Sequence, residues 1–183
     1  MNMNKKMVVK SSLVAVVLAG VCGAAFAGQD ATPMPATGQV KFVGAVVDAP
    51  CNIDAGSVDQ TIQMGVLSQQ SLYAKNTKVQ PFDIKLTQCS TATVKSAVVS
   101  FTGIVDANVK TDLSSGLGNV GIELSNDNGV IGLGQATTPQ ILNDGVNNLR
   151  FYAKAVYTGS DAKTVPAEIG DFAAVSQFSV TYQ

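Results

Sequence analysis

The chain has 183 residues, 46% of them hydrophobic and 14% charged, and its formal net charge is −1. Residues 1–27 hold three of the 12 Lys and Arg and none of the 13 Asp and Glu, so the other 156 residues have nine cations, 13 anions and a net charge of −4. A length of 156 residues suits one domain, and the negative net charge argues against nucleic acid or an anionic membrane as a partner. The chain contains no histidine, which excludes Ser-His and Cys-His catalysis.

Residues 1–27 have the pattern of a secretory signal peptide. Three lysines precede a short apolar run at residues 13–21, and an A-x-A motif ends at Ala27. The apolar run is too short for a transmembrane helix, so we expect cleavage between Ala27 and Gly28. A lipoprotein signal is the alternative, because Cys22 follows the apolar run. Lipoprotein processing usually requires a small residue just before the cysteine, and Val21 is not small.

Residues 28–47 form an extension ahead of the expected domain, residues 48–183. Its first part contains two prolines and no hydrophobic pattern. Its second part places four residues on alternate positions, Val40, Phe42, Gly44 and Val46. Period-two alternation predicts a strand that buries one face, and a lone strand needs a sheet edge, which need not be its own. The alternative is an ordinary first strand of the domain, and Gly44 permits either a bulge or a close approach.

Two cysteines follow the predicted signal peptide, Cys51 and Cys89. An even number of cysteines in an exported chain predicts a disulfide. Closing a loop of about 39 residues would stabilise the fold by roughly 4 kcal/mol in the chain-entropy model. A zinc site is the alternative, but two cysteines without histidine supply too few soft ligands.

Most of the remaining chain alternates with period two, which predicts a sandwich of several short strands. Turn-forming clusters separate the runs, and Asn128-Gly129 predicts a two-residue hairpin turn. Residues 67–75 have the composition of a short helical turn. The expected strands include Ile62-x-Met64-x-Val66, Phe82-x-Ile84-x-Leu86, the run 94–101, Val120-x-Ile122-x-Leu124, Leu149 to Tyr157, and Phe172 to Tyr182.

No pattern predicts an enzyme or a cofactor site. Residues 116–121 spell G-x-G-x-x-G, but they precede a strand instead of opening a helix, so we interpret them as a glycine-rich loop. The carboxylates are scattered, mostly among turn residues, and no pair stands out. We expect no metal and no cofactor.

The chain ends on three large apolar residues, Phe178, Val180 and Tyr182, which alternate with polar ones. Chain termini usually fray, so these side chains need a place to pack. A core strand satisfies this need, and a second role as a docking strand is compatible with it.

An ordered set of patterns runs through the whole chain after residue 27. It comprises Gly38-x-Val40-x-Phe42-x-Gly44-x-Val46-Val47-x-Ala49-x-Cys51, Val58-Asp59-Gln60-Thr61-Ile62-x-Met64-Gly65, Phe82-x-Ile84-x-Leu86-x-x-Cys89, Val120-Gly121-Ile122, Leu149-x-Phe151-x-Ala153 and Phe178-x-Val180-x-Tyr182-Gln183. On these residues the chain resembles subunits of chaperone–usher pili, close to the type 1 and P pilus rod subunits. Residues 163–171 match this family only loosely.

The resemblance implies an immunoglobulin-like β-sandwich that lacks its last strand and keeps a hydrophobic groove open. A periplasmic chaperone would fill the groove first, and at the outer-membrane usher the N-terminal extension of the next subunit would replace it. Val40, Phe42, Gly44 and Val46 would be the donor residues. The chaperone would pair with the strand of Phe178, Val180 and Tyr182, and Cys51–Cys89 would be the structural disulfide.

The resemblance therefore implies a structural subunit that passes through the periplasm and polymerises into a surface fimbria supporting cell adhesion. A minor adaptor or a terminator of the same pilus is the alternative. A receptor-binding adhesin is a weaker one, because 156 residues leave no room for a separate lectin domain.

Overall fold

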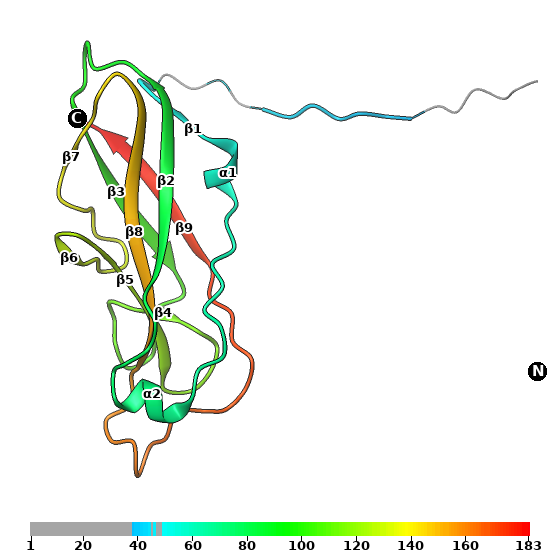
Figure 1. Ribbon diagram of the computed structural model, residues 1–183, viewed down its shortest axis with the longest axis vertical. Helices are drawn as coiled ribbons and strands as arrows, with labels where there is room; N and C mark the ends of the chain where they lie inside the picture. The colour runs from blue at the N-terminus through cyan, green and yellow to red at the C-terminus, as the bar shows by residue number, and fades with distance from the viewer. Residues whose placement is uncertain (1–37, 45, 47–48) are drawn as a thin grey trace, which may run out of the picture. The chain divides into compact units, whose positions relative to one another are not determined.

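The computed structural model describes residues 38–44, 46 and 49–183. The chain divides after Gly44 into two units. Residues 38–44 contain no helix or strand, whereas residues 49–183 form a domain of strands with two short helices (Figure 1). The predicted cleavage site at Ala27 and Gly28 lies outside the described residues.

The domain contains two helices and nine strands among its described residues. In chain order these are β1 (Asn52–Ile53), α1 (Ala55–Val58), α2 (Gln69–Tyr73), β2 (Gln80–Cys89), β3 (Ser96–Gly103), β4 (Leu113–Ser114), β5 (Val120–Asn126), β6 (Gly129–Val130), β7 (Gln140–Ile141), β8 (Gly145–Tyr157) and β9 (Ser176–Tyr182).

The strands form two antiparallel sheets. The larger sheet has the order β1-β2-β8-β5-β4, with β6 paired to β5, and the smaller sheet has the order β7-β3-β9. Figure 1 shows β2 and β8 of the larger sheet in front of β3 and β9 of the smaller one. The predicted all-β fold is confirmed. Among the described residues β9 pairs only with β3, so one long edge of the smaller sheet is open.

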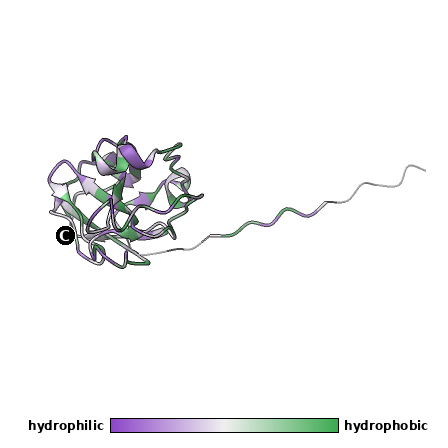
Figure 2. Ribbon diagram, turned by 90° about the horizontal axis from the view of Figure 1, so that it is seen from below, coloured by the Kyte–Doolittle hydropathy of each residue, from purple (hydrophilic) through white to green (hydrophobic). Residues whose placement is uncertain are grey.

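The core lies between the two sheets, where the alternating side chains meet. Ile84 and Leu86 on β2 are fully buried, and Lys85 between them points outward into an ion pair with Asp54. Phe151 on β8 is also fully buried and packs edge-on against Phe101 on β3, with the ring centroids 5.0 Å apart. Each such side chain contributes about 1.5–3 kcal/mol on burial. Figure 2 shows hydrophobic and hydrophilic residues mixed along the strands, as this alternation requires.

One expected strand is missing. Residues 59–68 contain no helix or strand, although Ile62 and Met64 are half-buried and alternate with exposed polar residues. The prediction of a strand there is wrong because a strand needs a hydrogen-bonded neighbour, and this stretch is not part of either sheet. Val66, the third member of the row, is exposed after Gly65 at φ +73°.

The predicted hairpin is present, but its turn lies one residue earlier. Asn126 pairs with Gly129, so Asp127 and Asn128 form the two-residue loop. The Asn126 side chain accepts a hydrogen bond from the Asn128 N–H at 3.0 Å, which closes an Asx-turn. The short helix expected within residues 67–75 is confirmed as α2, which begins after the N-cap Ser68.

Candidate functional site

A large apolar groove opens on the domain, with a volume of about 1360 Å³. Two segments far apart in the sequence line its sides: the first rim, residues 57–69, and the second rim, residues 168–175. The groove is also lined by residues of both sheets: Phe82, Ile84, Phe101, Leu113, Val120, Ile122, Leu124, Ala153 and Phe178. The groove therefore exposes the space between the sheets, where a complete sandwich would be closed.

The first rim is attached to β2 at its beginning. Asp54 caps α1 by accepting a hydrogen bond from the Gly56 N–H at 3.1 Å. The Ser57 hydroxyl then accepts from the Lys85 N–H at 3.0 Å, and the Gln60 side-chain amide donates to the Asp83 carbonyl at 2.9 Å. Beyond Gln60 the rim is held by its half-buried apolar side chains, not by a backbone ladder.

The second rim is attached where it begins. The Ala167 N–H donates to the Tyr73 hydroxyl at 3.0 Å, and the Ala167 carbonyl accepts from the Gln69 side-chain amide at 2.6 Å. Glu168 exchanges two hydrogen bonds with Gly118, at 2.9 Å from its N–H and 2.8 Å to its Oε2. Helix α2 and the glycine-rich loop, residues 116–121, therefore position this rim. The loop follows β4 and leads into β5, which begins at Val120, so it precedes a strand as predicted and does not open a helix.

Strand β9 supplies the open edge of the smaller sheet. Ser96 and Gln183 exchange two backbone hydrogen bonds, of 2.8 and 3.0 Å. Because hydrogen-bonded pairs alternate in an antiparallel sheet, the odd-numbered residues of β9 also direct their backbone N–H and C=O groups toward β3. In this register the N–H and C=O groups of Phe178, Val180 and Tyr182 point away from β3, toward the open edge. That edge is ready to accept another strand.

The same three residues direct their side chains toward the core. Phe178, Val180 and Tyr182 are each half-buried and pack against the core cluster, whereas the residues between them are exposed. Burial raises the pKa of the Tyr182 phenol, which agrees with apolar surroundings. The structure thus brings all three predicted residues together on β9, beside the groove.

The four predicted residues of the extension are exposed. Val40 is 74% exposed, Phe42 89% and Val46 104%, and Gly44 is exposed as well. Apolar side chains on alternate positions without a sheet to cover them are unusual in a soluble chain.

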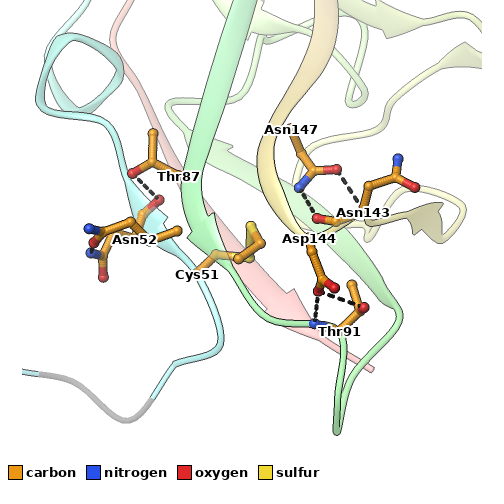
Figure 3. Close-up of a disulfide and its surroundings, with 9 residues drawn as sticks. Cys51, Asn52, Thr87, Thr91, Asn143, Asp144 and Asn147 are labelled. Atoms are coloured by element: carbon orange, nitrogen blue, oxygen red, sulfur yellow. Dashed lines mark hydrogen bonds between the residues drawn. A yellow bond between two sulfur atoms is a disulfide. The ribbon is translucent and has the colours of Figure 1, made fainter.

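The predicted disulfide joins Cys51 to Cys89, and both cysteines are buried. It ties the chain just before β1 to the last residue of β2. Figure 3 shows it beside Thr91, whose backbone N–H and hydroxyl donate to the Asp144 carboxylate at 2.7 and 2.8 Å. These two hydrogen bonds hold the pKa of Asp144 below its ordinary value, and the bond from the Thr91 backbone N–H has the larger effect. The first described residues of the domain are therefore covalently anchored to the end of β2.

Two further carboxyls, Asp106 and Asp112, are buried in the loop before β4. Asp106 accepts the N–H groups of Asn108 and Val109 at 2.9 and 3.0 Å, so it holds the loop together. Burial raises the pKa of Asp112, and the negative charge of the nearby Asp106 raises it further. The hydrogen bond from the Thr111 hydroxyl lowers this pKa but does not cancel the effect of burial. Within residues 38–44, 46 and 49–183, no group of three or more His, Cys, Asp or Glu side chains could hold a metal ion.

None of the helices in the described part of the chain has the length and hydrophobicity needed to cross a membrane.

The groove was not predictable residue by residue. Ile84, Ile122 and Leu124 have the pattern of ordinary core positions, and the second rim carries no recognisable motif. The first rim left one signal, the alternation of Ile62 and Met64.

Comparisons with known proteins agree with this geometry. The family model described as Fimbrial protein matches residues 40–183. The Fimbria A protein of Serratia marcescens is 42% identical, with 80% of this chain and 84% of the relative covered. The type-1 fimbrial protein A chain of Escherichia coli K12 is 35% identical, with coverage of 94% and 98%.

Solved structures give the same result. The crystal structure of the P pilus rod subunit PapA matches with a TM-score of 0.65 and 28% identity, covering 74% of this chain and all of that one. A subunit in the structure of a chaperone–usher pilus matches with a TM-score of 0.71 and 30% identity, covering 84% of this chain and all of that one. The chain therefore belongs to the fimbrial protein family and is a structural, non-enzymatic subunit of a bacterial surface pilus.

Proposed function

We propose that this subunit polymerises by donor-strand exchange. Residues 38–47 of one copy lie in the groove of the next, with Val40, Phe42, Gly44 and Val46 facing its apolar lining. The observation that carries the proposal is the apolar groove of about 1360 Å³ beside the open edge of β9. An added strand would satisfy the backbone groups of that edge.

The energetics support an extended strand as the occupant. Burying the side chains of Val40, Phe42 and Val46 contributes about 1.5–3 kcal/mol each. Each new backbone hydrogen bond adds about 0.5–1.5 kcal/mol, and ordering the extension costs about 1–2 kcal/mol per residue. These gains and this cost are of similar size, so we expect closure of the two rims around the strand to contribute to the stability of the joint.

The route to the cell surface is part of the proposal. A signal peptide of residues 1–27 directs the chain to the periplasm and is removed between Ala27 and Gly28. A periplasmic chaperone then pairs with β9 through Phe178, Val180 and Tyr182 and covers the groove of the domain, residues 48–183. At the outer-membrane usher, the extension of the next subunit, residues 28–47, replaces the chaperone.

The same features favour a subunit within the fibre over one at its base. A terminator needs a groove but no donor strand, and the donor row Val40, Phe42, Gly44 and Val46 is intact in this sequence. A minor adaptor has both features and is the second candidate.

The decisive variant is Gly44→Leu. If Gly44 faces the floor of the groove, a leucine side chain blocks entry of the strand, while the groove of the same subunit stays unaltered. We expect cells with the variant to accumulate a soluble chaperone complex and to show no fibres by electron microscopy. Val43→Leu, on the opposite row of the same strand, is the control and should assemble. Normal fibres from the Gly44 variant would refute the donor role.

A further inference from the structure

The charged residues that line the groove all have one sign. Its lining contains three charged residues, Asp59 on the first rim and Glu168 and Asp171 on the second, and all three are exposed acids. Glu168 is held in place by the Gly118 N–H at 2.8 Å. An incoming strand therefore meets negative charge from both segments that line the groove.

The part of the extension proposed to enter the groove, residues 38–47, carries the opposite charge. Among the described residues 38–44 and 46, Lys41 is the only charged one. It lies between Val40 and Phe42, so in an extended strand its side chain belongs to the row opposite the apolar donor row. Its ammonium group can then remain in water at the mouth of the groove while the apolar row is buried, and no charge loses its hydration.

The attraction between Lys41 and the acidic rims acts against a general electrostatic repulsion between two copies of the chain. After residue 27 the chain has nine cations and 13 anions, so two copies repel each other at long range. A lysine on the segment that must enter an acidic groove replaces that repulsion by a local attraction. Interactions between exposed charges are weak once formed, but they steer encounter and discriminate against strands of the wrong charge.

We propose that Lys41 is a specificity-determining residue: the acidic rims of the groove favour a donor strand with a cation at this position and disfavour one with an anion. This inference rests on the proposed donor-strand function. The favoured occupant is the extension of a second copy of this chain, and acidic strands from other proteins are disfavoured.

The test uses a labelled synthetic peptide of residues 36–47, with Lys41 or with the substitutions K41Q and K41E. The protein is the chain without the predicted signal peptide, from Gly28 to Gln183, carrying G44L so that its own extension does not compete. Fluorescence anisotropy gives the dissociation constant of each peptide. At about 0.01 M ionic strength, where the Debye length is about 30 Å, we expect K41Q to bind roughly threefold and K41E roughly tenfold more weakly. At about 1 M salt the three peptides should differ by less than about twofold.

The rims are tested by a double variant of the protein and a control variant. Asp59→Asn with Asp171→Asn should reduce the roughly tenfold difference between the Lys41 and K41E peptides to about threefold or less. Glu123→Gln on β5 also removes a charge, but Glu123 lies outside the groove lining, so this control should keep the full difference.

Two results would overturn the inference and leave the donor-strand function intact. One is equal binding of the three peptides at low salt. The other is a difference that the rim variants do not change. A third result, no saturable binding of any peptide, would overturn the donor-strand function itself and the inference with it.

Discussion

Phe178 on β9 lies directly opposite Phe101 on β3, and both side chains line the groove. Phe101 is buried and packs edge-on against Phe151, whereas Phe178 is only half-buried. The pair therefore marks the place where the closed core of the sandwich becomes the open groove.

Phe178→Ala should weaken binding of an added strand. Full burial of a phenylalanine contributes about 1.5–3 kcal/mol, and Phe178, which is only partly buried, still has part of its surface left to bury. We expect a peptide of residues 36–47 to bind roughly fivefold more weakly, a loss of about 1 kcal/mol. Gln177→Ala, on the exposed row of the same strand, is the control. Equal affinities for the two variants would show that Phe178 does not contact the occupant.

Gly103→Ala should disturb the second rim from the side of β3. A Cβ at this position would lie 2.5 Å from Leu113 Cδ2 and 2.7 Å from the Val175 carbonyl oxygen, so both neighbours must move. Overpacking of this kind costs about 1–3 kcal/mol of folding free energy. Urea denaturation should show the loss as a lower midpoint. Gly38→Ala, in the exposed extension, should keep the wild-type midpoint, and an unchanged midpoint for Gly103→Ala would contradict the close approach.

Replacing Cys51 and Cys89 together by serine should remove about 4 kcal/mol of stability in the chain-entropy model, because the bond closes a loop of about 39 residues. Urea denaturation of the double variant checks this value. Its midpoint should be insensitive to a reducing agent, whereas the wild-type midpoint should fall toward it when reduced. A double variant with the midpoint of the oxidised wild type would show that the bond adds no stability.

Asp112→Asn should stabilise the domain near neutral pH. The pKa of Asp112 is raised by burial, so folding favours the protonated carboxyl and ionisation of this group costs stability. The cost is absent below the unfolded pKa of about 3.9 and is complete above the raised pKa of the folded state. The asparagine keeps an oxygen that can accept from the Thr111 hydroxyl.

Thermal unfolding of both proteins between about pH 3 and pH 7 measures this linkage. The advantage of the variant should grow with rising pH through the acidic range and then level off. Glu123→Gln is the control for loss of a negative charge, because the Glu123 side chain is less buried than that of Asp112. A variant less stable than wild type at pH 7 would contradict the expected sign.

Much of the fold was predictable because a strand is encoded in neighbouring residues. Phe82-x-Ile84-x-Leu86 became β2, and the runs ending at Leu124 and Tyr157 became β5 and β8. The run from Phe172 to Tyr182 became β9 only from Ser176 onward, because residues 172–175 contain no helix or strand. The disulfide was also predictable, since two cysteines in an exported chain have one possible pairing. The hairpin was placed one residue late because the Asn126 side chain, not Asn128-Gly129 alone, sets the turn.

The candidate site was harder to predict because its parts come together only on folding. Ile62 and Met64 alternate as in a strand, yet they line a groove without forming one, because the missing partner is not a neighbouring residue. Likewise nothing near Asp59 in the sequence indicates that it shares a groove with Glu168 and Asp171.

The linear order of residues settled which side chains face inward along each strand, which cysteines pair and which apolar row precedes the domain, since alternation and composition are local properties. Folding alone decided that β9 keeps an open edge, that residues 57–69 and 168–175 border one groove and that this groove is acidic at its rims. The reason is physical: whether a backbone group has a partner, and which charges meet, depends on segments about a hundred residues apart being brought together by burial of the core between them.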